Sequence, residues 1–262
     1  MNDIPPASDP APTPSGAEQT PQPASPQAVR VGIPSSEPYV TYSIIGITVV
    51  IFILQLATRA LMRADIPAVF FIKSNELIRA GQIWRLLTPM LLHGSLAHIG
   101  FNMYALLSFG AGLERSFGHG RFLLLYLLGA FAGNVASFLF TDANSLGAST
   151  AVFGLIGAEA VFLIQNRKVF PGQFRGAIGN IIFIAAINLF IIGSLPGIDN
   201  WGHIGGLLGG LMFTSFAGPK WEVEGLYPAF HLVDKRPFHA VLVGAATVVL
   251  IFGGLAMWGM LR

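Results

Sequence analysis

Seven long apolar stretches, separated by shorter polar segments, dominate the sequence from residue 42 onward. A helix needs roughly 20 apolar residues to cross a hydrocarbon core about 30 Å thick. The stretches that come closest to this length are residues 42–62, 95–113, 121–140, 149–165, 177–195, 200–217 and 238–261. The pattern therefore predicts an all-α protein, a polytopic membrane bundle of seven helices.

Two segments outside these stretches have a different pattern. Residues 1–38 are rich in Pro, Ala, Ser and Gln and carry almost no large apolar side chains, which predicts a disordered tail. The tail has no apolar run typical of a signal peptide, so the first long stretch is expected to serve as signal anchor. Residues 63–94 mix charges with the apolar run 66–72. That mixture favours a structured loop lying partly in the membrane interface.

The composition agrees with a membrane protein and removes several function classes. The 262-residue chain is 53% hydrophobic and 11% charged, whereas soluble domains carry about 25% charged residues. Its few cations are scattered rather than clustered, so nucleic acid is not an expected partner. The chain contains no cysteine, which excludes thiol catalysis, disulfides and cysteine-ligated zinc.

Basic residues predict the orientation in the membrane. The second-to-third, fourth-to-fifth and sixth-to-seventh connections contain Arg115, Arg121, Arg167, Lys168, Arg175, Lys220, Lys235 and Arg236. The intervening loops 141–148 and 196–199 contain no Lys or Arg. Because Lys and Arg are enriched on the cytoplasmic side, the N-terminus and the basic connections are placed in the cytoplasm. The cations in and beside the loop 63–94 argue against this orientation but are outweighed by the three basic connections.

With this orientation, the second, fourth and sixth stretches all begin at the outer face. They bring His98 with Asn102, Ser149, and His203 to a similar depth, although the stretches are far apart in the sequence. An ionisable residue at hydrocarbon depth is costly and is a functional-site candidate by default. The shared depth predicts a single polar site built from three helices.

Serine and histidine together are the minimum set for making a nucleophilic alkoxide. Ser149 begins a helix, where it is either an N-cap or a nucleophile beside free N–H donors that stabilise an oxyanion. His203, neutral in apolar surroundings, is either a general base or a histidine bonded to a backbone carbonyl. Asp199, four residues earlier, is expected to cap the sixth helix rather than to complete a triad.

The spacing of other residues supports the same site. His98 and Asn102 lie on one helical face and are suitable oxyanion donors; the alternative is an interhelical hydrogen bond worth ~0.6 kcal/mol. Small residues let membrane helices approach closely, and this would bring Ser149 Oγ within ~3 Å of a His203 ring nitrogen. The small residues are Gly154, Gly157 and Ala158 in the fourth stretch and, in the sixth, Gly202, Gly205, Gly206, Gly209 and Gly210.

In combination and in this order, these motifs resemble the rhomboid intramembrane serine proteases over roughly residues 40–216. The matching elements are Trp84-Arg85, His98-xxx-Asn102, Glu114 followed by Gly118, Gly147-x-Ser149 and Gly202-His203-x-Gly205-Gly206. The resemblance implies Ser149 as nucleophile and His203 as general base. It implies an oxyanion hole formed by His98, Asn102 and the Ser149 backbone N–H. The residues with implied supporting roles are Trp84, Arg85, Glu114, Gly147, Phe153, Gly205 and Gly206.

Three positions depart from the family pattern. Thr150 follows the serine where the family usually has glycine, and its β-branch could stiffen the turn or crowd a substrate. Phe153 stands where tyrosine is common and can still pack against the His203 imidazole. Gly202 replaces a common alanine, a change that is expected to matter little. None of these departures removes a catalytic group.

The resemblance implies a six-helix rhomboid-like core at residues 39–217, followed by a cytoplasmic connection, 218–237, and a seventh helix, 238–262. It implies a serine endopeptidase of the bacterial cytoplasmic membrane, cleaving transmembrane segments of protein substrates near the outer face. Neither cofactor nor metal is expected, and the lipid bilayer is the other partner. The main alternative is a catalytically silent relative that binds transmembrane segments.

Two further alternatives come from other protein classes. A membrane cytochrome would use His98 and His203 as axial haem ligands, but haem explains neither Ser149 nor Asn102. A transporter would show internal repeats, and no convincing repeat is present. The other intramembrane proteases fit less well, because the chain has no His-Glu-x-x-His zinc motif and no pair of intramembrane aspartates.

Overall fold

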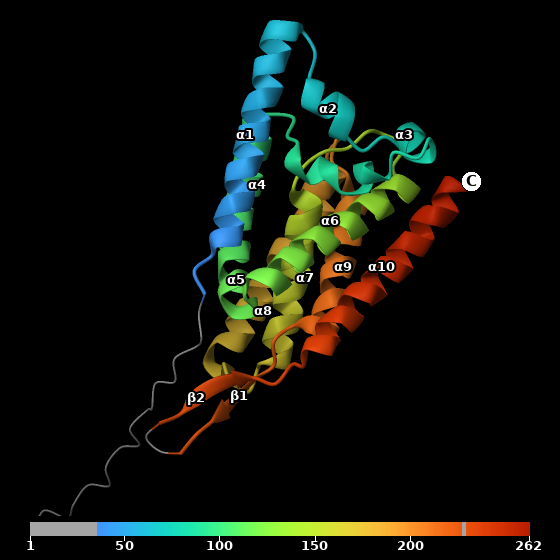
Figure 1. The fold of residues 1–262 in the computed structure, drawn as a ribbon. Helices are drawn as coiled ribbons and strands as arrows, with labels where there is room; N and C mark the ends of the chain where they lie inside the picture. Colours follow the sequence, from blue (N-terminus) through green and yellow to red (C-terminus); the bar gives the residue numbers. More distant parts are fainter. Residues whose placement is uncertain (1–35, 227–228) are drawn as a thin grey trace, which may run out of the picture. The chain divides into compact units, whose positions relative to one another are not determined.

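A computed structural model describes residues 36–226 and 229–262; the expected tail, residues 1–38, lies almost wholly outside the described residues. The described part contains seven long helices (Figure 1). Their bounds are α1 Tyr39–Met62, Leu96–Phe117 (α4 Leu96–Ala105, a π-helical segment Leu106–Gly110 and α5 Ala111–Phe117), α6 His119–Phe140, α7 Ser149–Gln165, α8 Pro171–Ala186 with its continuation Ile187–Ser194, α9 Asn200–Ala217 and α10 Phe238–Met260.

Each predicted apolar stretch coincides with one of these helices, so the predicted helical membrane fold is confirmed. Five of the helices are long and apolar enough to span a membrane by themselves, and Ser149–Gln165 is a shorter apolar helix. The second helix continues to Phe117 rather than ending at residue 113. The division into a core at 39–217 and an added seventh helix stays a prediction.

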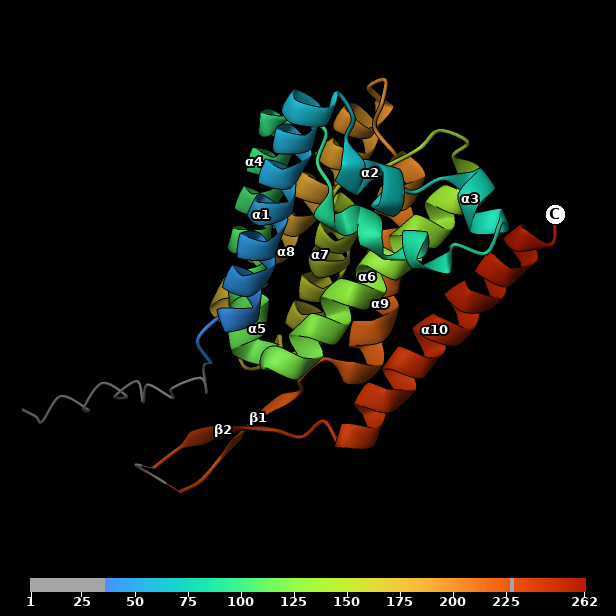
Figure 2. The same cartoon turned by 45° about the horizontal axis from the view of Figure 1, so that its top comes forward.

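Helices α6, α7 and α9 form the core of the described residues. Side chains with no exposed surface include Phe122 and Leu125 of α6, Leu155 of α7 and Phe213 of α9. Helix α10 packs against α6 and α9 and lies on the side away from α1 in both views (Figures 1 and 2). A helix that is buried on several sides is apolar all round rather than along one stripe. Helix α9 is such a helix, and glycines occupy its contact faces.

Helix α8 differs from this core because Ile181 is the only buried side chain among its described residues. Ile182, Phe183 and Phe190 expose 61%, 62% and 79% of their surface. Such large apolar side chains on a membrane helix face lipid rather than water. Helix α8 therefore lies at the edge of the bundle, and its last turns change to π-helical and then 3₁₀ geometry at Ile187–Ile191 and Ile192–Ser194.

The segment 63–94 forms short helices and no spanning helix, as predicted. They are α2 Ile66–Phe71, α3 Asn75–Arg79 and two 3₁₀ turns, Ile83–Leu86 and Thr88–Leu91. Arg85 holds the segment together by donating hydrogen bonds to the carbonyl oxygens of Val69 and Ile72 at 2.6 and 2.7 Å. Trp84 Nε1 donates to the Phe70 carbonyl oxygen at 3.1 Å. These bonds give the two residues of the Trp-Arg motif a structural role.

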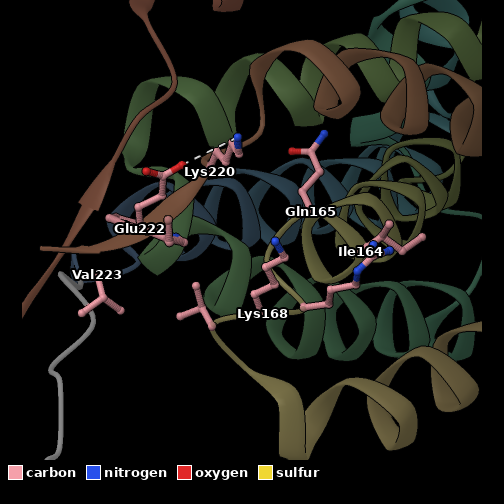
Figure 3. Close-up of a pocket in the computed structure, with 9 residues that line it drawn as sticks. Ile164, Gln165, Lys168, Lys220, Glu222 and Val223 are labelled. Atoms are coloured by element: carbon pink, nitrogen blue, oxygen red, sulfur yellow. Dashed lines mark ion pairs between the residues drawn. The ribbon is translucent and has the colours of Figure 1, made fainter.

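The connection 218–237 contains an antiparallel hairpin that the sequence pattern did not predict. Its strands are β1 Trp221–Glu224 and β2 His231–Asp234, with Trp221 opposite Asp234. A cavity of about 540 Å³ lies between the hairpin and the end of α7 (Figure 3). Its lining includes three cations, Arg167, Lys168 and Lys220. The hairpin thus lines a basic cavity at the C-terminal end of α7, whereas Ser149 is at the N-terminal end of the same helix.

Candidate active site

Ser149 and His203 meet at the contact between α7 and α9. The Ser149 Oγ lies 3.0 Å from His203 Nε2, which is hydrogen-bond distance. The imidazole is buried and stacks on the Phe153 ring, with 4.3 Å between ring centroids and an interplanar angle of 11°. Phe153 is one turn after Ser149 on the same helix, so one helix supplies the hydroxyl and a surface that orients the ring.

The turn before α7 places Ala148, and not Ser149, at the N-cap position. The N-cap of α7 is Ala148, and no side chain caps this helix, so the N-cap alternative for Ser149 is wrong. Gly147 has a φ of 134°, which glycine adopts without strain. A Cβ at Gly147 would also lie 2.8 Å from two atoms of the His98 ring. The motif Gly147-x-Ser149 therefore needs glycine for both backbone conformation and space.

Glycines explain how α7 and α9 come close enough for the two side chains to meet. A Cβ at Gly206 would lie 2.0 Å from the Thr150 carbonyl oxygen, and one at Gly210 would lie 1.9 Å from that of Gly154. On another face of α9, a Cβ at Gly205 would lie 2.4 Å from the Ala136 Cβ of α6. Helix α9 is thus wedged between two backbones at a separation that only glycine permits.

Asp199 caps α9, as the sequence predicted. Its carboxylate accepts a hydrogen bond from the Gly202 backbone N–H at 3.1 Å and another from the Thr141 hydroxyl at 2.9 Å. His203 Nδ1 is buried and has no hydrogen-bond partner among the described residues. The serine and histidine therefore form a pair, with no carboxylate bonded to the far side of the ring.

His98 and Asn102 lie on α4, and the His98 ring approaches the turn before Ser149. A Cβ on Gly147 would lie 2.8 Å from the His98 ring and 3.7 Å from Ser149 Oγ, so the ring and the hydroxyl border the same space. Asn102 is buried and its amide Nδ2 donates to the His98 carbonyl oxygen at 2.9 Å. An asparagine amide has two N–H donors, so one N–H remains in addition to the one that bonds His98.

His93 is a site residue that the sequence analysis missed. It is fully buried, its ring lies edge-on to His98 with centroids 5.0 Å apart, and its Nε2 accepts a hydrogen bond from the Ala148 backbone N–H at 3.4 Å. Burial, reinforced by the nearby His98, lowers the pKa of His93 to about 3. The ring is therefore neutral and able to accept. A second histidine five residues before His98 was the available signal.

The Glu114-Gly118 segment lies away from the pair. Glu114 is fully buried and its carboxylate accepts hydrogen bonds from the Val40 and Thr41 backbone N–H groups at 2.8 and 2.7 Å. It also accepts from the Thr41 hydroxyl at 2.7 Å. Gly118, with a φ of 75°, ends α5. Glu114 thus fastens the beginning of α1 to α5 by satisfying N–H groups that a helix start leaves unpaired.

Comparison with known proteins identifies the family. A family model described as the Rhomboid domain matches residues 80–220, more than half of the chain. The chain belongs to the rhomboid family. It is an integral membrane protein, and the range matched contains Ser149, His203, His98 and Asn102 together with the Trp84-Arg85 motif.

Individual relatives agree with this assignment. Rhomboid protease GluP of Bacillus subtilis (strain 168) is 40% identical over 222 residues, which cover 84% of this chain and 41% of the relative. RHOMBOID-like protein 6, mitochondrial, of Arabidopsis thaliana is 37% identical over 194 residues, covering 70% and 62% of the two chains. RHOMBOID-like protein 1 of Arabidopsis thaliana is 40% identical over 189 residues, covering 68% and 48%. The chain thus spans between two fifths and two thirds of the length of these relatives.

Proposed function

We propose that this rhomboid-family protein is an intramembrane serine endopeptidase that cleaves transmembrane segments of other proteins. The observation that carries the proposal is the 3.0 Å separation of Ser149 Oγ and His203 Nε2 at a closely packed helix contact. The likeness to a relative named as a rhomboid protease supports the same conclusion. The proposed oxyanion hole is formed by His98, Asn102 and the Ser149 backbone N–H.

The reaction follows from these positions. His203 Nε2 takes the Ser149 Oγ proton as the oxygen attacks the scissile carbonyl carbon, and N–H donors stabilise the resulting oxyanion. The imidazolium gives this proton to the leaving amine nitrogen when the C–N bond breaks, which leaves an acyl-enzyme. Water then attacks the ester, with His203 first accepting its proton and finally returning a proton to Ser149 Oγ.

A transmembrane substrate must unwind locally before this attack. The amide of a helix is hydrogen-bonded within the helix and surrounded by side chains, so its carbonyl carbon is not accessible to a serine. Ser149 begins α7, close to one end of the bundle. Water therefore needs to reach only part of the bilayer depth to complete hydrolysis.

The charge distribution supports the orientation. The end of α7 opposite Ser149 lies beside Arg167, Lys168 and Lys220, and positively charged connections favour the cytoplasm. We therefore place this end in the cytoplasm and the Ser149 end toward the outer face of a bacterial cytoplasmic membrane. Reaction of Lys168→Cys with a membrane-impermeant thiol reagent tests this orientation, since the natural chain contains no cysteine. Labelling in intact cells would contradict it.

The test of activity combines a covalent probe with a substrate. A fluorophosphonate is expected to label the purified wild-type protein, and a model transmembrane substrate is expected to be cleaved. Ser149→Ala and His203→Ala should each lose labelling and reduce cleavage by roughly 10⁴-fold or more, because a catalytic pair acts as a unit. Equal cleavage by wild type and Ser149→Ala would reject the serine mechanism. Binding of the substrate without cleavage or labelling would identify a silent relative.

A further inference from the structure

The end of α6 contacts the two segments that precede Ser149 and His203 in the chain. Ser137, fully buried on α6, contacts the Ser145 hydroxyl at 3.1 Å and also donates a hydrogen bond to the Asp199 carboxylate. Ser145 is four residues before Ser149, and Asp199 is four residues before His203. One hydroxyl therefore connects the two segments that lead into the catalytic residues.

Lys73 joins the same region from the segment 63–94. Its backbone N–H donates to the Ser145 carbonyl oxygen at 3.1 Å, and the Ser145 N–H donates back at 3.2 Å. Its side chain is fully buried, and the ammonium donates to the carbonyl oxygens of Thr141 and Ala143 at 2.5 and 3.0 Å. Thr141 is the C-cap of α6, and a cation at this end of a helix is stabilised by the helix dipole.

The charges around Lys73 explain how a buried ammonium is tolerated. Burial lowers the pKa of Lys73 to about 8, the negative charges of Asp199 and Asp142 counteract this, and Arg79 adds to the lowering. A buried charge needs charged or hydrogen-bonding partners to offset its lost hydration. Asp199 also accepts from the Thr141 hydroxyl at 2.9 Å. The lysine and the aspartate thus bind different atoms of the same residue, since Lys73 donates to the Thr141 carbonyl oxygen and Asp199 accepts from its hydroxyl.

We propose that Lys73, Ser137, Thr141, Ser145 and Asp199 form a polar clamp that holds Ser149 at hydrogen-bond distance from His203. These are positioning residues, since none touches the reacting atoms. The clamp ties the loop before α7 and the beginning of α9 to one helix end, so a shift of either segment changes the Oγ–Nε2 separation. This inference rests on the proposed serine protease function.

Two clamp variants and two matched controls test the proposal in the full-length protein. Lys73→Met removes the ammonium but keeps an unbranched apolar side chain of similar length, and Ser137→Ala removes the shared hydroxyl. Lys168→Met alters an exposed lysine at the hairpin end, and Ser215→Ala alters an exposed hydroxyl that bonds only within its own helix, to the Leu211 carbonyl oxygen. The second-order rate of fluorophosphonate labelling at Ser149 and the kcat of substrate cleavage are measured for all four.

Both clamp variants should label at least about 10-fold more slowly than wild type and lose kcat rather than KM, because misplacement of reacting groups by about 1 Å is costly. The controls should match wild type. Removing one partner from a set of buried charges is often destabilising, and Lys73→Met also removes the donor to the Thr141 and Ala143 carbonyl oxygens. The Tm of each variant is therefore measured, and labelling and kcat are compared well below the lowest Tm. A loss of reactivity that persists there, where every variant is folded, identifies a positioning role.

The pH dependence provides an independent readout. The pKa of Lys73 is about 8 in the folded protein and near 10.5 when exposed, so between these values the unfolded state binds more protons and wild-type stability rises with pH. Labelling of wild type should instead fall above pH 8, because loss of the ammonium charge removes its attraction for Asp199. Both the rise in stability and the fall in labelling rate with pH should be absent from Lys73→Met when it is compared with wild type at each pH.

The outcomes separate the clamp from the proposed function. Loss of the Ser149-dependent signal in wild type itself would reject the protease function. A labelled wild type with equally fast Lys73→Met and Ser137→Ala proteins at every pH would reject the clamp alone. If Lys73→Met does not fold, Ser137→Ala decides, and an unchanged rate for that variant overturns the clamp.

Discussion

The two ends of the helical bundle are both polar, but they are built in different ways. At the Ser149 end, polar side chains such as Ser137 and His93 are completely buried and are joined by hydrogen bonds. At the hairpin end, Lys220 and Glu222 are half exposed and form an ion pair at 3.7 Å. The cavity of about 540 Å³ lies at the hairpin end and contains no member of the candidate active site (Figure 3).

The difference shows why open volume is a poor guide to chemistry in this protein. Hydrogen bonds among buried groups hold positions accurately because an unsatisfied partner is costly. Exposed ion pairs are screened by water and salt and contribute about 1 kcal/mol or less. Substitutions at the Ser149 end should therefore change reaction rate strongly, and those at the hairpin end should change it little.

The largest expected effect among the supporting residues belongs to Asn102. Asn102→Ala should lower kcat by about 10²–10³-fold, because it removes one of the N–H donors of the proposed oxyanion hole. The matched control is Asn134→Ala, since Asn134 is also buried and its amide likewise bonds the carbonyl oxygen four residues earlier, that of Ala130. Steady-state cleavage of a model substrate measures both. Equal losses in the two variants would mean that Asn102 acts only in packing.

An intermediate effect is expected where α9 meets α7. Gly206→Ala places a Cβ where the Thr150 carbonyl oxygen lies, so the helices must separate. The free energy of unfolding should fall by about 1–3 kcal/mol, and fluorophosphonate labelling should slow as His203 moves from Ser149. Gly253→Ala on α10 is the control, because a Cβ there meets nothing within 4 Å. Unfolding in denaturing detergent reports stability, and a wild-type value for Gly206→Ala would contradict the close contact.

The smallest effect should come from the hairpin. Arg121 and Asp234 form an ion pair at 2.5 Å with about one fifth of each side chain exposed. Asp234→Asn should lower the free energy of unfolding by about 1 kcal/mol and leave the labelling rate of Ser149 unchanged. Glu222→Gln, at the more exposed pair with Lys220, should change neither quantity measurably. A slowed labelling rate in Asp234→Asn would instead show that the two ends of the bundle are coupled.

Much of the helical framework was readable from the sequence because a bilayer imposes a simple rule. A spanning segment must be long, apolar and internally hydrogen-bonded, so each helix is encoded locally. A close contact between α7 and α9 was also foreseeable from their small residues, and it made a Ser149–His203 pair one of the alternatives. The 3.0 Å distance agrees with that expectation.

Other features depend on contacts between distant residues and left little local signal. The hairpin at 221–234 lies in a connection for which the sequence pattern predicted no secondary structure. Nothing near Lys73 in the sequence indicates that its ammonium reaches the end of α6, and Ser137 reads as an ordinary small residue of an apolar helix. His93 was overlooked because a histidine before a helix has many possible roles until its neighbours are known.

The sequence alone determined the helices, the small residues between them and the polar groups that each carries, because the bilayer and backbone sterics act on every segment separately. Only the tertiary structure decided which polar groups pair. Whether Ser149 caps its helix or faces an imidazole, and whether Lys73 faces solvent or a helix end, depends on distances between segments that no local pattern encodes. Those distances are set by how closely α6, α7 and α9 pack.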